Sequence, residues 1–185
     1  MKQLIILVDM DDTIEYLTEA WVAYLNEKHG TDVDWRDIKE WDITKKYPSL
    51  TPDEVFHPLF EEEFWKTVHP MEDAVEYLHK LSDEGHKIFV VTSSHYKTLM
   101  PKLKHVLFRY FPFLTWRNVI VTTCKQMISG DVLIDDAPFN LEDGEYRKIL
   151  MNAPHNESYD AERNGMTRVY HWSDIYRLIC DLASE

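Results

Sequence analysis

Short runs of apolar residues recur along the chain, and they limit the possible folds more than any other feature of the sequence. Runs that are apolar at every position are typical of parallel strands covered on both faces. In chain order they occupy residues 5–8, 88–91, 119–121, 132–134 and 149–151. The sequence therefore predicts a parallel β-sheet.

Helical patterns lie between the later runs. One apolar face spans residues 74–81 and stops at Gly85, and a second helix is expected to start near Pro101. A third helix is expected to start at Ser173, because serine is a favoured N-cap. The expected buried positions are Ala74, Leu78, Leu81, Leu103, Val106, Leu107, Tyr110, Ile175, Leu178, Ile179 and Leu182. Strands that alternate with helices predict a three-layer, Rossmann-like α/β fold.

Residues 14–69 interrupt this alternation, since they contain helical patterns and turn signals but no convincing apolar run. Thr51, Pro52 and Glu54 form a helix-start signal within them. With 185 residues, the chain can bury one sizeable core but is short for two independent domains. We therefore expect a core of residues 1–13 and 70–185, with 14–69 as a small helical insertion. The polar stretch 152–165 is expected to be a surface loop.

The charge balance disfavours two classes of partner. The chain has 33 acidic and 20 basic residues, for a formal net charge of -13, which repels nucleic-acid backbones and anionic membranes.

The first apolar run is too short for a signal peptide or a membrane span, and Cys124 and Cys180 form no disulfide framework. We expect a cytoplasmic protein that binds neither nucleic-acid polymers nor membranes, and its oligomeric state stays open.

Polar residues follow four of the apolar runs, at the strand ends where parallel sheets bind ligands. They are Asp9 and Asp11, then Thr92, Ser93 and Ser94, then Lys125, then Asp135 and Asp136. Two carboxylates about 4 Å apart repel by about 4 kcal/mol at an effective dielectric constant of about 20, so such acids need a cation between them. Oxygen ligands favour Mg²⁺ over zinc. An acid nucleophile, a second acid, an ammonium and hydroxyls suit phosphoryl transfer.

These motifs resemble those of the haloacid dehalogenase-like superfamily, in the same order and strand context, across residues 4–140. "ILVDMDDT" resembles its DxDx(T/V) signature, "IFVVTSS" its second motif, "TTCK" its third and "VLIDDAP" its fourth. The combination is most similar to the 5'(3')-deoxyribonucleotidases. The resemblance implies a Mg²⁺-dependent phosphatase that acts on (deoxy)nucleoside monophosphates through an aspartyl-phosphate, with the insertion as a cap over its site.

The resemblance also implies a role for each acid. Asp9 is the nucleophile, and Asp11 is the acid that later activates water. Mg²⁺ is expected to bind the Asp9 carboxylate, the Asp11 backbone carbonyl and Asp135. Asp136 is expected to lie beside this set.

The remaining contacts are also taken from the resemblance. Thr92, Ser93 and Lys125 are expected to bind the phosphate, and Trp41 of the insertion is expected to contact the base. Asp12 stands where deoxyribonucleotidases usually have glycine.

Simpler structural explanations exist for several of these residues. Aspartates 135 and 136, and the hydroxyls of residues 92–94, could be helix caps. Lys125 could be a solvated surface charge, and Trp41 could belong to a core. His155 follows the fifth run near the expected ligand face, where a loop position is the simpler interpretation. A phosphatase for another small phosphomonoester and a non-catalytic nucleotide- or metal-binding module are the alternative functions.

Overall fold

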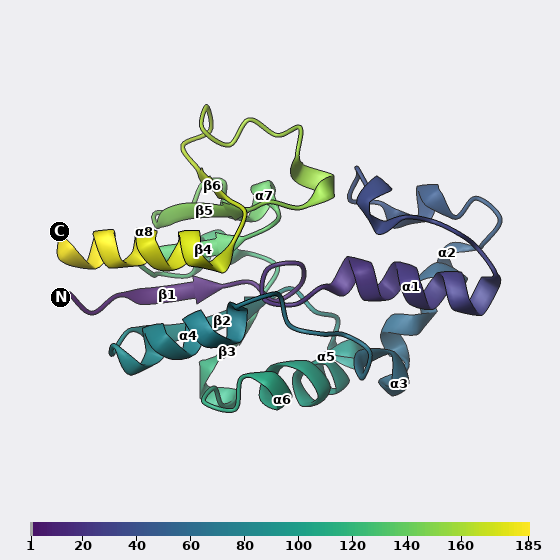
Figure 1. Ribbon diagram of the computed structural model, residues 1–185, viewed down its shortest axis with the longest axis horizontal. Coiled ribbons are helices and arrows are strands. Elements are labelled where there is room, and N and C mark those ends of the chain that lie inside the picture. The colour runs from purple at the N-terminus through teal and green to yellow at the C-terminus, as the bar shows by residue number, and fades with distance from the viewer. Residues whose placement is uncertain (1) are drawn as a thin grey trace.

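A six-stranded parallel sheet organises residues 2–185, the part of the chain that the computed structural model describes (Figure 1). Its strands are β1 (Ile5–Val8), β2 (Lys87–Thr92), β3 (Val119–Val121), β4 (Val132–Asp135), β5 (Arg147–Met151) and β6 (Thr167–Val169). The strand order is β3-β2-β1-β4-β5-β6. The order reverses at β1, and the crevice at the carboxyl end of such a strand is where α/β sheets bind ligands.

The five predicted strands are confirmed, and the prediction missed only the sixth. Strand β6 pairs with β5 through residues 167–169. Thr167 and Arg168 are polar and half-buried, because β6 lies at the edge of the sheet. An edge strand does not need the unbroken apolar run that identifies a central one.

Helices cover the two faces of the sheet unequally. The successive residues Ile6 and Leu7 of β1 belong to two different apolar clusters, because neighbouring side chains of a strand point to opposite faces of the sheet. On the Ile6 face lie α4 (Ala74–Asp83), α5 (Tyr96–Lys102), η4 (Leu103–Leu107), α6 (Phe108–Tyr110) and α8 (Trp172–Ser184). On the Leu7 face lie α7 (Pro138–Leu141) and irregular segments. The fold is α/β with three layers, of which one is thin.

Two predicted helix starts are wrong. The helix expected near Pro101 starts at Tyr96, so this proline lies inside it, and the chain continues as a π-helical turn, η4. Helix α8 starts at Trp172, so His171 is its N-cap and Ser173 lies inside its first turn. The helix over residues 74–81 and the polar loop after β5 are confirmed, with one short turn, η7 (Pro154–Asn156), inside the loop.

Between β1 and α4 every regular element is helical. These elements are α1 (Leu17–His29), η1 (Trp35–Asp37), η2 (Ile43–Lys46), α2 (Pro52–Phe56), η3 (His57–Phe60) and α3 (Glu62–Trp65). Figure 1 shows them beyond the end of the sheet at which β1 stops. The predicted capping box starts α2, since Thr51 Oγ1 accepts from Glu54 N at 3.3 Å and the Glu54 carboxylate accepts from Thr51 N at 2.8 Å.

The helical insertion shares its apolar interior with the sheet. Trp21, Val55 and Phe64 are buried in the same cluster as Ile6 and Val8 of β1. The division of the chain into a core and an insertion of residues 14–69 therefore remains a prediction. Within residues 2–185, none of the helices is both long and apolar enough to cross a membrane.

Candidate active site

Asp9 lies where β1 ends, at the centre of the carboxyl edge of the sheet. Its backbone N–H donates to the carbonyl oxygen of Ile134 at 2.8 Å, which holds the turn after β1 against β4. Its side chain is buried. Burial raises the pKa of Asp9 to about 7, with Lys125 acting against the shift and Asp135 adding to it. The protein thus holds this carboxyl where bulk water does not stabilise its charge.

Lys125 joins two of the strand ends. It comes from η6 (Lys125–Met127), which follows β3, and it is only 1% exposed. Its ammonium donates to the Asp9 carboxylate and, at 2.7 Å, to Asp135 Oδ2. Burial opposes this charge, but the two carboxylates outweigh burial and raise the pKa of Lys125 above its ordinary value. Lys125 is therefore not a solvated surface charge, and the structure brings Asp9, Lys125 and Asp135 together.

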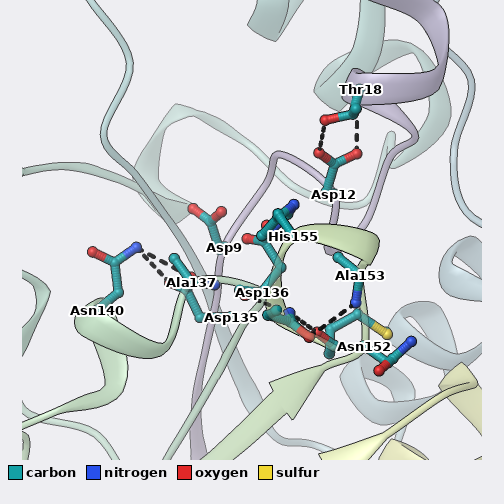
Figure 2. A network of polar contacts seen from close by, with 12 residues as sticks. Asp9, Asp12, Thr18, Asp135, Asp136, Ala137, Asn140, Asn152, Ala153 and His155 are labelled. Carbon is teal, nitrogen blue, oxygen red and sulfur yellow. Dashed lines mark hydrogen bonds and ion pairs between the residues drawn. The ribbon is translucent and has the colours of Figure 1, made fainter. Parts of the chain in front are cut away.

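The two aspartates at the end of β4 have different surroundings (Figure 2). Asp135 Oδ1 accepts from Ala137 N at 2.9 Å and from Asn140 Nδ2 at 3.1 Å, so both of its oxygens are engaged. Asp136 is equally buried, yet its Oδ1 has no hydrogen-bond partner among residues 2–185. Burial raises the pKa of Asp136 to about 7. Oxygens of Asp9, Asp135 and Asp136 lie within 4.8 Å of one another, a donor set that suits a hard divalent cation.

His155 lies in the predicted loop after β5, but its side chain reaches the acids and is more than a loop decoration. Its side chain is buried, and Nε2 lies 2.8 Å from Asp136 Oδ2. Burial lowers the pKa of His155, but Asp136 outweighs burial and the net shift is upward. Asp12 lies nearby at φ 48° and accepts from Thr18 N at 3.0 Å, which caps the start of α1 (Figure 2). Aspartate tolerates this left-handed conformation, so Asp12 can stand where the resemblance leads us to expect glycine.

Lys102 is a site residue that the sequence analysis missed. It is 1% exposed, and its ammonium donates to an Asp11 carboxylate oxygen at 2.6 Å, to Thr92 Oγ1 at 3.1 Å and to Ser94 Oγ at 2.9 Å. Burial would raise the pKa of Asp11, but Lys102 outweighs burial and lowers it. A helical period starting at Leu99 would have placed position 102 on the buried face, which is an unusual place for a lysine.

The hydroxyls after β2 do not cap the next helix, because His95 occupies the N-cap position of α5. Thr92 is buried, with Oγ1 2.9 Å from Ser94 Oγ. Ser93 is exposed, and its hydroxyl donates to the Thr122 carbonyl at 2.9 Å, toward the end of β3. Of the two residues predicted to bind phosphate here, only Thr92 has its hydroxyl among the buried charges.

A cavity of about 380 Å³ lies between these acids and the helical insertion. Asp11, Asp12, Asp136 and His155 line its inner wall. The helical insertion, which includes α1, supplies an apolar wall made of Leu17, Trp21, Ile38, Ile43 and Phe56. Trp41 lies on the rim, 59% exposed, with its ring centroid 4.8 Å from that of His155 and 5.2 Å from that of Phe139. The cavity can hold an aromatic group beside the acids.

Comparison with known proteins gives consistent matches over nearly the whole chain. Residues 3–184 match the family model described as "5' nucleotidase, deoxy (Pyrimidine), cytosolic type C protein". Over 175 residues the chain is 34% identical to a 5'(3')-deoxyribonucleotidase of Bacillus subtilis (strain 168), covering 94% of this chain and 96% of the relative.

Two solved structures share the fold. A HAD family hydrolase from Deinococcus radiodurans R1, with bound phosphate and sodium, aligns at a TM-score of 0.64 with 17% identity, covering 97% of this chain and 96% of that one. A HAD-hydrolase from Bacillus subtilis, bound to magnesium, aligns at a TM-score of 0.61 with 14% identity, covering 97% and 99%.

Proposed function

Because the chain belongs to the family of 5' nucleotidase, deoxy (pyrimidine), cytosolic type C proteins, we propose that it hydrolyses (deoxy)nucleoside monophosphates to nucleoside and inorganic phosphate, with Mg²⁺ as cofactor. The predicted resemblance to the haloacid dehalogenase-like superfamily is confirmed, and the chain is a phosphatase of the nucleotidase type. The observation that carries the proposal is a pair of buried hydrogen bonds, from the Lys125 ammonium to Asp9 and to Asp135. They lie beside a cavity large enough for a nucleoside.

In the proposed reaction an Asp9 carboxylate oxygen attacks the phosphorus atom. The bond from phosphorus to the nucleoside oxygen breaks, and that oxygen takes a proton from Asp11, which must be protonated in the substrate complex although Lys102 lowers its pKa in the free protein. Water then attacks the aspartyl-phosphate, Asp11 accepts a proton from that water, and phosphate leaves. Lys125 neutralises charge on the phosphoryl group from its position against Asp9, and Thr92 donates to a phosphoryl oxygen.

The donor set of the site fits Mg²⁺, which would neutralise phosphoryl charge when bound. The sequence predicted Asp9, the Asp11 backbone carbonyl and Asp135 as its ligands. Both oxygens of Asp135 already accept hydrogen bonds, whereas Asp136 has a buried oxygen without a partner among residues 2–185. We therefore assign Asp136 as the ligand from β4 and Asp135 as the residue that orients Lys125. His155 would orient Asp136 through its contact with Oδ2, the oxygen that does not face the metal.

The cavity gives the helical insertion its proposed role as a cap over the nucleoside. Its apolar wall suits the faces of an aromatic base, and Trp41 stands on its rim. Stacking of a base on such a ring contributes about 1–3 kcal/mol and tolerates many bases. The insertion thus favours nucleotides over phosphates that carry no aromatic group.

Phosphate release from a panel of substrates tests this function. The panel holds the deoxyribonucleoside and ribonucleoside monophosphates, with 5' and 3' phosphates, and several sugar phosphates, each with Mg²⁺ and with EDTA. We expect release from deoxynucleotides that stops in EDTA and in Asp9→Asn, whose amide cannot act as the nucleophile. Faster release from sugar phosphates would favour a different substrate class. Nucleotide binding without release would favour a non-catalytic module.

A further inference from the structure

Lys102 brings a second buried positive charge to the site, and the reaction outlined above gives it no task. Its ammonium lies 5.8 Å from the ring centroid of Trp65, in α3 of the helical insertion. A buried ammonium is costly unless hydrogen-bond acceptors surround it. Its acceptors come from the end of β1 and the end of β2, the two strand ends where the proposed acid and the proposed phosphate-binding hydroxyl lie.

The helix that carries Lys102 is irregular at this point. Pro101, the preceding residue, has no backbone N–H to donate, and the π-helical turn η4 begins at the next residue, Leu103. Single π-turns within α-helices are frequent at functional sites. The irregularity therefore coincides with the side chain that reaches the strand ends.

A count of hydrogen-bond donors limits what Lys102 can do. An ammonium has three protons and no acceptor, and all three protons of Lys102 are used by Asp11, Thr92 and Ser94. Both hydroxyl oxygens accept from Lys102, so both hydroxyls are free to donate. Because they lie 2.9 Å apart, one donates to the other. One hydroxyl proton of this pair then remains for an acceptor outside it.

We infer that Lys102 is a positioning residue, which turns the Thr92–Ser94 pair so that its remaining proton is donated to a phosphoryl oxygen and which holds the Asp11 carboxylate in place. This inference rests on the proposed phosphatase function. Lys102 acts through Thr92 and Asp11 and does not itself touch the phosphoryl group. Preorganised donors of this kind contribute strongly to catalysis because they need no rearrangement during the reaction.

A double-mutant cycle between Lys102 and Thr92 tests the inference. Wild type, Lys102→Met, Thr92→Val and the double variant are assayed for turnover of a deoxynucleotide and of p-nitrophenyl phosphate. Binding of inorganic phosphate to each resting enzyme, with Mg²⁺ present, is read from the melting temperature. Lys87→Met is the control, because this exposed lysine lies at the opposite end of the same strand as Thr92.

We expect Lys102→Met to lower kcat by about 10²-fold, the effect of losing one oriented donor. Its phosphate affinity should fall by about tenfold, the effect of one ordinary hydrogen bond. In the Thr92→Val background the same change should cost less, because one of the two residues through which Lys102 acts is already gone and only its effect on Asp11 remains. Lys87→Met should behave as wild type.

Additive losses, or a Lys102→Met enzyme within twofold of wild type in both kcat and phosphate affinity, would overturn the inference. If the Met variant does not fold, Lys102→Gln enters the same cycle, since its amide supplies two of the three donors. A wild-type enzyme that binds phosphate but hydrolyses no phosphoester would contradict the proposed function alone, and the phosphate shifts would still decide the role of Lys102. A wild-type enzyme that binds no phosphate would overturn both.

Discussion

Asp135 and Asp136 are adjacent, equally buried and chemically identical, yet their surroundings give them opposite effects on stability. Asp135 accepts from Lys125 and Asn140, so its charge is compensated. Asp136 has His155 on one oxygen and no partner among residues 2–185 on the other. A buried carboxylate oxygen without a partner costs stability, which the protein tolerates when that oxygen serves a ligand.

This difference predicts that Asp136→Asn stabilises the metal-free protein by about 1 kcal/mol, because it removes the charge of a buried carboxyl that has His155 on one oxygen and no partner among residues 2–185 on the other. The same variant should lose the rise in melting temperature that Mg²⁺ gives wild type, which at a hundred times Kd corresponds to about 2.7 kcal/mol. The matched change Asp135→Asn should instead destabilise by about 3 kcal/mol, since it removes a partner of buried Lys125. Thermal melts with and without Mg²⁺ measure both, and an intact Mg²⁺ shift in Asp136→Asn would contradict the assignment.

At the level of single elements, the site depends on how β1 is anchored. The strand starts where Leu4 N donates to His86 Nδ1 at 3.1 Å, and His86 is 7% exposed. Burial lowers the pKa of His86 below its ordinary value of 6.5, and Glu84 only partly offsets this. Because the unfolded chain then binds the proton more readily, stability is present above pH 6.5 and is lost as the pH falls below it.

We therefore expect wild type to lose more stability between pH 8 and pH 5.5 than His86→Gln does. His79→Gln, which changes an exposed histidine of α4, should lose as much as wild type. Chemical denaturation at the two pH values measures the difference. Equal losses in wild type and His86→Gln would show that β1 is not anchored through a neutral histidine.

The elements also show why the sequence predicted most of the fold but only part of the site. Central strands such as β1 and β4 are buried on both faces, so their apolar runs are unbroken and identify them. The edge strand β6 carries no such pattern. Site residues that directly follow a strand, such as Asp9, could be found from that position. Lys102 lies at the end of a helix, where the helical period marks it as a buried lysine but only its three-dimensional contacts show that it reaches Asp11.

For the molecule as a whole, the central feature is that two parts of the chain enclose one cavity. The sheet supplies the acids, and the helical insertion supplies the apolar wall and the exposed ring of Trp41. Ring contacts from Trp41 to Phe139 and His155 connect the insertion to the core at the rim. The proposed function therefore assigns substrate recognition and chemistry to different parts of the chain, which mutations can separate.

Trp41→Ala should raise KM for deoxynucleotides by about tenfold, as expected for the loss of one stacking contact of about 1–3 kcal/mol. The rate with p-nitrophenyl phosphate, whose small ring needs less of the cavity, should change much less. Trp116→Ala is the control, because Trp116 is similarly exposed at 57% and lies outside the cavity lining. Steady-state kinetics with both substrates measures the contrast, and equal losses with both would contradict a role in base recognition.

Trapping the covalent intermediate tests the central claim most directly. Enzyme turning over a deoxynucleoside monophosphate with Mg²⁺ is quenched in acid, and the peptide that contains Asp9 is analysed by mass spectrometry. We predict a phosphoryl group on Asp9 that hydroxylamine removes and that is missing from Asp9→Asn and from samples incubated with EDTA in place of Mg²⁺. Full turnover with no phosphoryl group on this peptide, or turnover that survives in Asp9→Asn, would contradict it.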